Sequence, residues 1–129
     1  MRETKFRGLG VDGKWWFGES SPTGENRINL ATFFANVHAG AIRPETVGEW
    51  TGGKDGKSGK EIYCGDIGKP RSRFSPTLWE VYWDERVCQF RVCAHGDRQF
   101  DKTHTVDWID EVVSNIYENP ELLGKKETT

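Results

Sequence analysis

The stretch LWEVYWDERVCQFRVC, residues 78–93, decides the predicted fold. Apolar and polar residues alternate in its two halves, as they do where successive side chains point to opposite faces of a β-sheet. The apolar side chains that share a face are Trp79, Val81 and Trp83 in the first half, and Cys88, Phe90 and Val92 in the second. Between the halves, Asp84-Glu85-Arg86 is polar and typical of a turn. The stretch therefore predicts a β-hairpin with strands over residues 78–83 and 87–93.

The composition of the whole chain agrees with a mainly β protein. Its 129 residues are enough for one domain with a single core. Fifteen glycines indicate many turns and little long helix, and an aromatic fraction of 12% with six tryptophans argues against disorder. Since no apolar run approaches the ~20 residues that span a bilayer, we expect no membrane association.

Short elements are predicted on both sides of the central hairpin. Residues 5–8 and 14–17 flank the turn Val11-Asp12-Gly13 and predict an N-terminal hairpin. The positions of the turn-forming residues Gly and Pro further predict a loop at 20–26, a short strand at 46–50, a hairpin tip at 52–59 and a basic loop at 68–76. Residues 28–37 and 106–117 fit either helix or strand, because apolar residues recur there at both spacings.

The charges are unevenly distributed although the net charge is only −2. Residues 54–73 hold six basic side chains against three acidic ones, and residues 101–123 hold six acidic side chains against one lysine. The candidate contacts to a nucleic-acid backbone are Lys54, Lys57, Lys69, Arg71 and Arg73. Tryptophan or tyrosine would stack on bases beside them. The sequence pI near 5.9 gives nucleic-acid binding no overall support, and pairing of the two segments between subunits is the alternative.

The glycine-rich residues 52–58 contain Gly-Lys-Ser, which is part of the phosphate-binding loop of many nucleotide-binding proteins. Such a loop needs a glycine at position 51, where this chain has Thr51. The residues that follow are typical of a strand, whereas a phosphate-binding loop leads into a helix. We therefore interpret 52–58 as part of a solvated hairpin loop.

The residue types of a zinc site are also present, as Cys64, Cys88, Cys93, His95 and His104. In one strand over 87–93, however, Cys88 and Cys93 would point to opposite faces. For catalysis, Cys93 and His95 would share a face, and Glu61 and Asp66 form an acidic pair, but neither spacing fixes a reactive geometry. We expect no enzymatic activity, no metal and no cofactor.

A long motif in residues 44–67 reads PETVGEWTG (44–52), KD (54–55), GKEIY (59–63) and GDI (65–67). With MRE (1–3) and KFR (5–7) before it and NIYENPELL (115–123) after it, the chain resembles the YopX family of phage and prophage proteins. The family motif residues, interpreted as structural, are Thr51, Gly52, Asp55, Gly59, Lys60, Ile62, Tyr63, Gly65, Asp66, Asn115, Asn119 and Pro120.

The resemblance implies a small, β-rich protein with a complex fold of coiled and bifurcated sheets in a single domain over 1–123, followed by a polar tail at 124–129. It favours a strand over 111–117 and a turn or short helix over 119–123. It also implies assembly into oligomers, and it carries no known reaction. Cys64 stands where the family commonly has glutamate, which weakens any acidic catalytic or metal-binding role at that position.

The motif has a physical explanation as a set of turns. Thr51 and the glycines after it are expected at the hairpin tip, and Ile62 and Tyr63 are expected to return the chain to the core. At the turn Gly65-Asp66, the aspartate can accept hydrogen bonds from nearby backbone amides. Recurring turn residues of this kind are typical of fold determinants.

These observations favour a non-enzymatic accessory protein of a phage or prophage that self-associates and works through contacts with phage or host proteins. Six tryptophans exceed what a small core readily encloses, and aromatic residues are enriched at interfaces. A nucleic-acid-binding protein is the alternative. The charged start and the odd count of three cysteines are typical of the bacterial cytoplasm.

Overall fold

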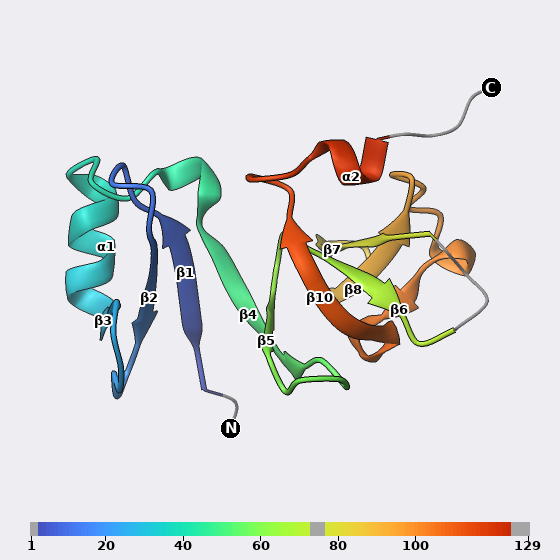
Figure 1. The fold of residues 1–129 in the computed structure, drawn as a ribbon, viewed down its shortest axis with the longest axis horizontal. Helices are drawn as coiled ribbons and strands as arrows, with labels where there is room; N and C mark the ends of the chain where they lie inside the picture. Colours follow the sequence, from blue (N-terminus) through green and yellow to red (C-terminus); the bar gives the residue numbers. More distant parts are fainter. Residues whose placement is uncertain (1–2, 73–76, 125–129) are drawn as a thin grey trace. The chain divides into compact units, whose positions relative to one another are not determined.

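The computed structural model describes residues 3–72 and 77–124 and consists mainly of short strands (Figure 1). The chain divides into two compact units, one up to Gly52 and one from Gly53 onward. The strand order is β3-β2-β1-β4-β5 in one sheet and β10-β6-β7-β8-β9 in the other. The mainly β class predicted from the sequence is confirmed. In the described part of the chain, no helix is both long enough and apolar enough to span a membrane.

The first unit contains a hairpin, a helix and the start of a fourth strand. Its elements are β1 (Lys5–Leu9), β2 (Trp15–Glu19), β3 (Arg27–Asn29), α1 (Leu30–His38), a 3-10 turn (Pro44–Thr46) and β4 (Gly48–Lys54). Strands β1 and β2 pair antiparallel around residues 10–14, which confirms the predicted N-terminal hairpin. Strand β3 pairs parallel with β2, and the loop between them covers the predicted residues 20–26.

Residues 28–37 combine the two predicted alternatives. The strand ends at Asn29, whose side-chain oxygen accepts a hydrogen bond from the backbone N–H of Thr32 at 2.8 Å. This N-cap satisfies a backbone donor of the first turn and begins α1. The helix packs against β2, where the fully buried Phe33 covers Gly18.

The second unit contains the rest of the strands and the C-terminal turn of helix. Its elements are β5 (Glu61–Tyr63), β6 (Asp66–Pro70), β7 (Trp79–Asp84), β8 (Gln89–Ala94), β9 (His104–Thr105), β10 (Ile109–Asn115) and α2 (Glu121–Gly124), with 3-10 turns at Phe100–Lys102 and Val106–Trp108. The core cluster is formed by Ile62, Val81, Val92, Ile109 and Val112, with Trp79, Val106 and Trp108 packed against it.

The central hairpin is confirmed as β7 and β8, with Val81 opposite Val92 and Trp83 opposite Phe90. One part of the prediction is wrong. Cys88 precedes β8 and has a φ of 52°, so it belongs to the turn and does not share a strand face with Phe90 and Val92. The turn is longer than the three polar residues suggested, because Val87 and Cys88 complete it.

Other boundaries also differ from the prediction. Gly68–Pro70, expected in a loop, are the last residues of β6, because they pair with β10. Residues 71–72 follow the strand, and residues 73–76 of that loop lie outside the described residues. The strand expected at 46–50 starts at Gly48, since Thr46 belongs to a 3-10 turn. Residues 106–117 form a 3-10 turn and then β10, so the strand favoured by the resemblance is confirmed over 111–115 but wrong for Ile116 and Tyr117.

Candidate functional site

Asp55 connects the loop after β4 to strand β10. Its carboxylate is almost completely buried, with 4% of the residue exposed. It accepts hydrogen bonds from the backbone N–H groups of Ser58 (2.8 Å), Lys60 (3.2 Å) and Val112 (3.0 Å). Val112 lies beside an irregularity in the β6–β10 pairing. Asp55 therefore closes its own loop and also joins that loop to a strand distant in sequence.

The hydrogen bonds decide the charge of this side chain. Burial acts to raise the pKa of Asp55, but the backbone donors of Val112, Ser58 and Lys60 outweigh it and lower the pKa to about 2. Three backbone donors and the Ser58 hydroxyl converge on a carboxylate that remains ionised at neutral pH. The arrangement holds a proton too weakly for acid catalysis at neutral pH, and it is typical of a structural carboxylate.

The two parts of the family motif meet at the ends of β6 and β10. Asp66 lies opposite Asn115 in the antiparallel pairing, and the backbone N–H of Ile116 donates to Gly65 O at 2.9 Å. Gly65 has a φ of +96°, and a Cβ there would lie 3.0 Å from the Tyr117 ring, so the position favours glycine on two grounds. Residues 65–66 and 115–117 thus form one joint.

The side chains of this joint act on backbone groups, as the turn interpretation expects. Asp66 is 1% exposed and accepts a hydrogen bond from the backbone N–H of Tyr63 at 2.7 Å. Asn115 accepts from the backbone N–H groups of Tyr117 (3.0 Å) and Glu118 (2.9 Å). The turn at Asn119 and Pro120 then leads into the single-turn helix α2, as the resemblance predicts for 119–123.

Some motif residues lie elsewhere than expected. Thr51 and Gly52 are inside β4, so the prediction that they form the hairpin tip is wrong. The tip is made by residues 55–60, where the Gly59 N–H donates to Asp55 O and the Asp55 N–H to Lys60 O. Strand pairing extends past the glycines because backbone hydrogen bonding does not require a side chain. Ile62 and Tyr63 are 0% and 2% exposed, which confirms their return to the core.

The candidate catalytic pairs are not arranged for catalysis. Cys93 is fully buried in β8, and burial, the largest influence, raises the pKa of its thiol. His95 follows the end of β8 with a φ of 56°, so the expected shared strand face with Cys93 is wrong. Of the acidic pair, Glu61 accepts from the Tyr63 hydroxyl at 3.0 Å and Asp66 accepts from the Tyr63 backbone. Both carboxylates therefore accept hydrogen bonds from the same residue, Tyr63.

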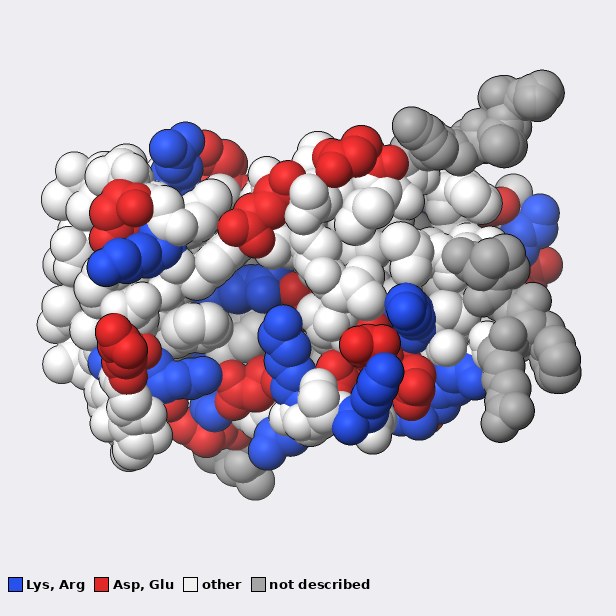
Figure 2. Space-filling view, in the orientation of Figure 1, with Lys and Arg blue, Asp and Glu red and all other residues white. Residues whose placement is uncertain are grey.

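The basic and acidic segments meet within the chain. Glu111 of β10 lies 3.5 Å from the Lys57 ammonium and 3.8 Å from that of Lys69, which is opposite it on β6. Asp110 pairs with Arg71 at 3.5 Å. Figure 2 shows Lys and Arg interspersed with Asp and Glu where β6 and β10 lie in Figure 1. Of the other candidate nucleic-acid contacts, Lys54 ends β4, and Arg73 lies outside the described residues.

An apolar surface lies at the turn end of the β7–β8 hairpin. Trp83 and Phe90 are opposite each other, with ring centroids 4.9 Å apart in an edge-to-face arrangement. Trp83 is 44% exposed and Val87 in the turn is 37% exposed. Two residues further along the strands, on the same face, Val81 and Val92 belong to the core cluster. This face of the hairpin therefore belongs to the core at Val81 and Val92 and reaches solvent at Trp83. We call Trp83, Phe90 and the turn residue Val87 the hairpin-end surface.

The tryptophans keep partial exposure throughout the two units. Trp83 is exposed, and the other five, Trp15, Trp16, Trp50, Trp79 and Trp108, are half-buried. Two of them lie under charged side chains, Trp50 under the Lys5 ammonium and Trp15 under the Arg7 guanidinium. No tryptophan has the complete burial of Phe33 or Tyr63.

The structure is that of a β-rich protein, with short strands in one mixed and one antiparallel sheet. Side chains of the sequence motif cap the turns between strands, so these residues support the fold. The family model described as YopX protein matches residues 5–124, nearly the whole chain, and the chain belongs to this family. A search of curated proteins finds no match.

Proposed function

We propose that this protein is a non-enzymatic phage or prophage accessory protein that self-associates through the hairpin-end surface. The observation that carries the proposal is the aromatic pair of the exposed Trp83 and the half-buried Phe90, with the exposed Val87 in the adjoining turn. Aromatic side chains of this kind dominate the energetics of protein interfaces, because they bury large areas at a small cost in conformational entropy.

The distribution of charge supports a second copy of the chain as the occupant of this surface. With a net charge of −2, two copies repel each other only weakly. The ion pairs that Lys57, Lys69 and Arg71 make with Glu111 and Asp110 of β10 satisfy the basic and acidic segments within one chain, so these segments are not needed for pairing between subunits. Burial of the hairpin-end surface is then the favourable contribution to association.

Replacing Trp83 by serine is expected to weaken self-association by about thirtyfold, because truncating a central interface tryptophan costs about 2 kcal/mol. The dissociation constant is measured by sedimentation velocity or by light scattering after size-exclusion chromatography over a concentration series. Leu122→Ser is the matched control, since Leu122 is similarly exposed at 41% but lies in α2. A wild-type protein that stays monomeric at millimolar concentration would contradict the proposal, and so would equal effects of the two variants.

Nucleic-acid binding is the second candidate, and one observation favours it. The backbone N–H of Arg71 donates to Trp108 O at 2.9 Å, which places this basic residue beside an aromatic cluster. In that cluster His104 stacks on Trp108 with centroids 4.0 Å apart, and Trp79 packs edge-on against both. Bases can stack on such a platform next to a cationic contact. The acidic partners of Lys57, Lys69 and Arg71 oppose this function, because they offset the local positive charge.

Binding to single-stranded oligonucleotides at low salt separates the two candidates. Under the self-association proposal we expect no salt-dependent binding of DNA or RNA in fluorescence anisotropy. Binding that falls steeply with salt and is lost in an Arg71→Ala, Arg73→Ala double variant would establish the alternative. Lys102→Ala is the control, because Lys102 is an exposed cation that pairs with Asp97 and lies in the 3-10 turn Phe100–Lys102, outside the basic segment.

A further inference from the structure

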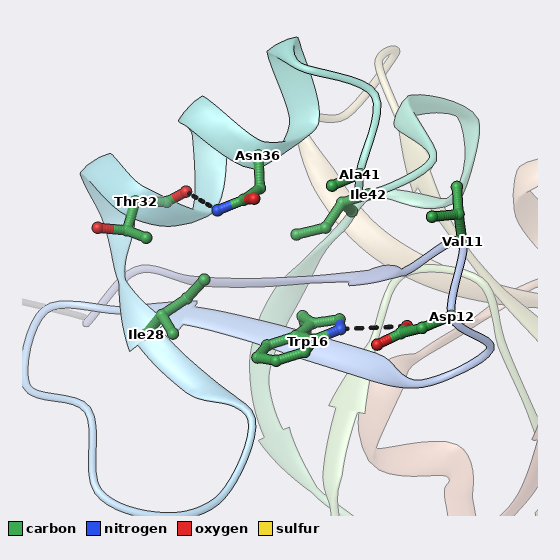
Figure 3. Close-up of a pocket in the computed structure, with 8 residues that line it drawn as sticks. All are labelled: Val11, Asp12, Trp16, Ile28, Thr32, Asn36, Ala41 and Ile42. Carbon is green, nitrogen blue, oxygen red and sulfur yellow. Dashed lines mark hydrogen bonds between the residues drawn. The ribbon is translucent and has the colours of Figure 1, made fainter.

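A cavity of about 370 Å³ lies in the first unit between α1 and the strands (Figure 3). It is lined by residues of the β1–β2 turn, β2, β3, α1 and the segment after α1: Val11, Asp12, Trp16, Ile28, Thr32, Asn36, Ala41 and Ile42. Its volume falls within the range of pockets that hold small organic molecules. None of these residues belongs to the family motif or to the hairpin-end surface, so the cavity is a separate feature.

The cavity exists because the helix presents different side chains along its length. Phe33 fills the space above Gly18 completely. The cavity wall on α1 is instead made by Thr32 and Asn36, where the Asn36 side-chain amide donates to Thr32 O at 2.8 Å. Neither side chain is large enough to fill the space above the Trp16 indole. A flat aromatic floor and an aliphatic wall of Ile28 and Ile42 are left accessible (Figure 3).

One carboxylate is held at the edge of this cavity. Asp12 Oδ1 accepts hydrogen bonds from the backbone N–H of Lys14 at 3.1 Å and from the Trp16 indole N–H at 3.4 Å. The hydrogen bond from the Lys14 backbone is the largest influence on the side chain and lowers the pKa of Asp12, although burial acts in the opposite direction. Both of these hydrogen bonds go to Oδ1, which leaves Oδ2 for a ligand.

The lining selects a class of ligand. It contains one carboxylate and no lysine or arginine, so it disfavours anions. Its aliphatic and indole surfaces favour an apolar body, and the face of a tryptophan ring also attracts a cation. We propose that this cavity binds a small organic cation, with a compact aromatic or aliphatic body against Trp16, Ile28 and Ile42 and a protonated amine that donates to Asp12 Oδ2.

A matched set of three probes tests the class of ligand directly. These are 2-phenylethylamine, which is protonated at neutral pH, the neutral 2-phenylethanol and the anionic 3-phenylpropionate. Binding is followed by ¹H–¹⁵N correlation spectra of the intact chain, where the Trp16 indole N–H reports on the cavity. We expect the amine to shift the signals of the lining residues and to bind about tenfold more tightly than the alcohol, because a charge-assisted hydrogen bond contributes this much. The propionate is expected to bind most weakly.

Two variants and a control distinguish the contribution of the carboxylate from that of the cavity. Asp12→Asn keeps the oxygen that accepts from Lys14, and it is expected to remove the preference for amine over alcohol without removing the turn. Ala41→Phe is expected to fill the cavity and abolish binding of both probes, whereas Ala35→Phe, on the exposed part of α1 outside the lining, leaves binding unchanged.

Two results would overturn the proposal. The first is the absence of shifts at the lining residues with all three probes at millimolar concentration. The second is equal affinity for amine and alcohol that Asp12→Asn does not alter. Both readouts are independent of the oligomeric state measured for the hairpin-end surface.

Discussion

Replacing Asp55 by asparagine is expected to lower the free energy of unfolding by about 3 kcal/mol, measured by urea denaturation at pH 7. The carboxylate accepts from backbone donors on both of its oxygens. An asparagine retains one acceptor and directs an NH₂ group at the second set of donors. Either the Val112 N–H or the loop donors are then left buried without an acceptor.

The same carboxylate makes the stability depend on acid. The pKa of Asp55 is about 2 in the folded protein, below its ordinary value of 3.8. Its contribution is therefore fully present above about pH 5, and it declines as the pH falls through 4 toward 2, since the unfolded chain takes up the proton first. The loss is about 2 kcal/mol. Asp84, whose pKa is also about 2, adds to the acid sensitivity, so the difference between wild type and Asp55→Asn isolates the effect of Asp55.

Asp110→Asn is the matched control for this prediction. Asp110 lies on β10 two residues before Val112 and pairs with Arg71, but its side chain is 43% exposed. An exposed ion pair of this kind contributes about 0–1 kcal/mol. Equal destabilisation by the two variants, or an unchanged acid profile for Asp55→Asn, would show that Asp55 is not the central contact of the loop.

Replacing Gly18 by valine is expected to cost about 3 kcal/mol or more, because the side chain has no space. A Cβ at this position would lie 2.6 Å from Cγ and 2.7 Å from Cβ of Phe33. Phe33 is fully buried between α1 and the strands and cannot move aside without moving the helix. Gly18→Ala is expected to cost about 1–2 kcal/mol, since it introduces one atom into the same contact.

A double-mutant cycle shows whether this clash is the cause. In a Phe33→Leu background, where the side chain is smaller and can rotate, Gly18→Ala is expected to cost about 1 kcal/mol less than in the wild type. Thermal unfolding followed by circular dichroism gives the four values. Additive effects would mean that Gly18 is required for a reason other than its contact with Phe33.

Much of the local structure is predictable from the sequence, because strands and turns have short-range signals. The alternation in 78–93 predicts β7 and β8, and the Asp12-Gly13 turn predicts the pairing of β1 with β2. The segments that stayed open, 28–37 and 106–117, each contain a change of element. The spacing of apolar residues over such a segment mixes the helix period with the strand period, so it identifies neither element.

The candidate site was predictable only in part. Asp66 and Asn115 are identifiable as turn residues, yet nothing in their spacing shows that they lie opposite each other. The contact of Asp55 with Val112 spans 57 positions, and the ion pairs of Lys57 and Lys69 with Glu111 span comparable intervals. In the sequence, only an aspartate in a turn before an aromatic strand points to the cavity beside Trp16. Many hairpins share this pattern, so it does not predict a cavity.

By itself the sequence determined the β-rich class, the two hairpins, the turn residues and membership of the YopX family, because each depends on residues close together in the chain or on a motif read in order. The tertiary structure decided which charged side chains pair with one another and which aromatic side chains reach solvent. Pairing of β6 with β10 places the basic and acidic segments in contact, and the pairing of β7 with β8 carries Trp83 and Phe90 beyond the core. Side-chain burial and long-range pairing depend on how distant strands meet, and local patterns do not encode that register.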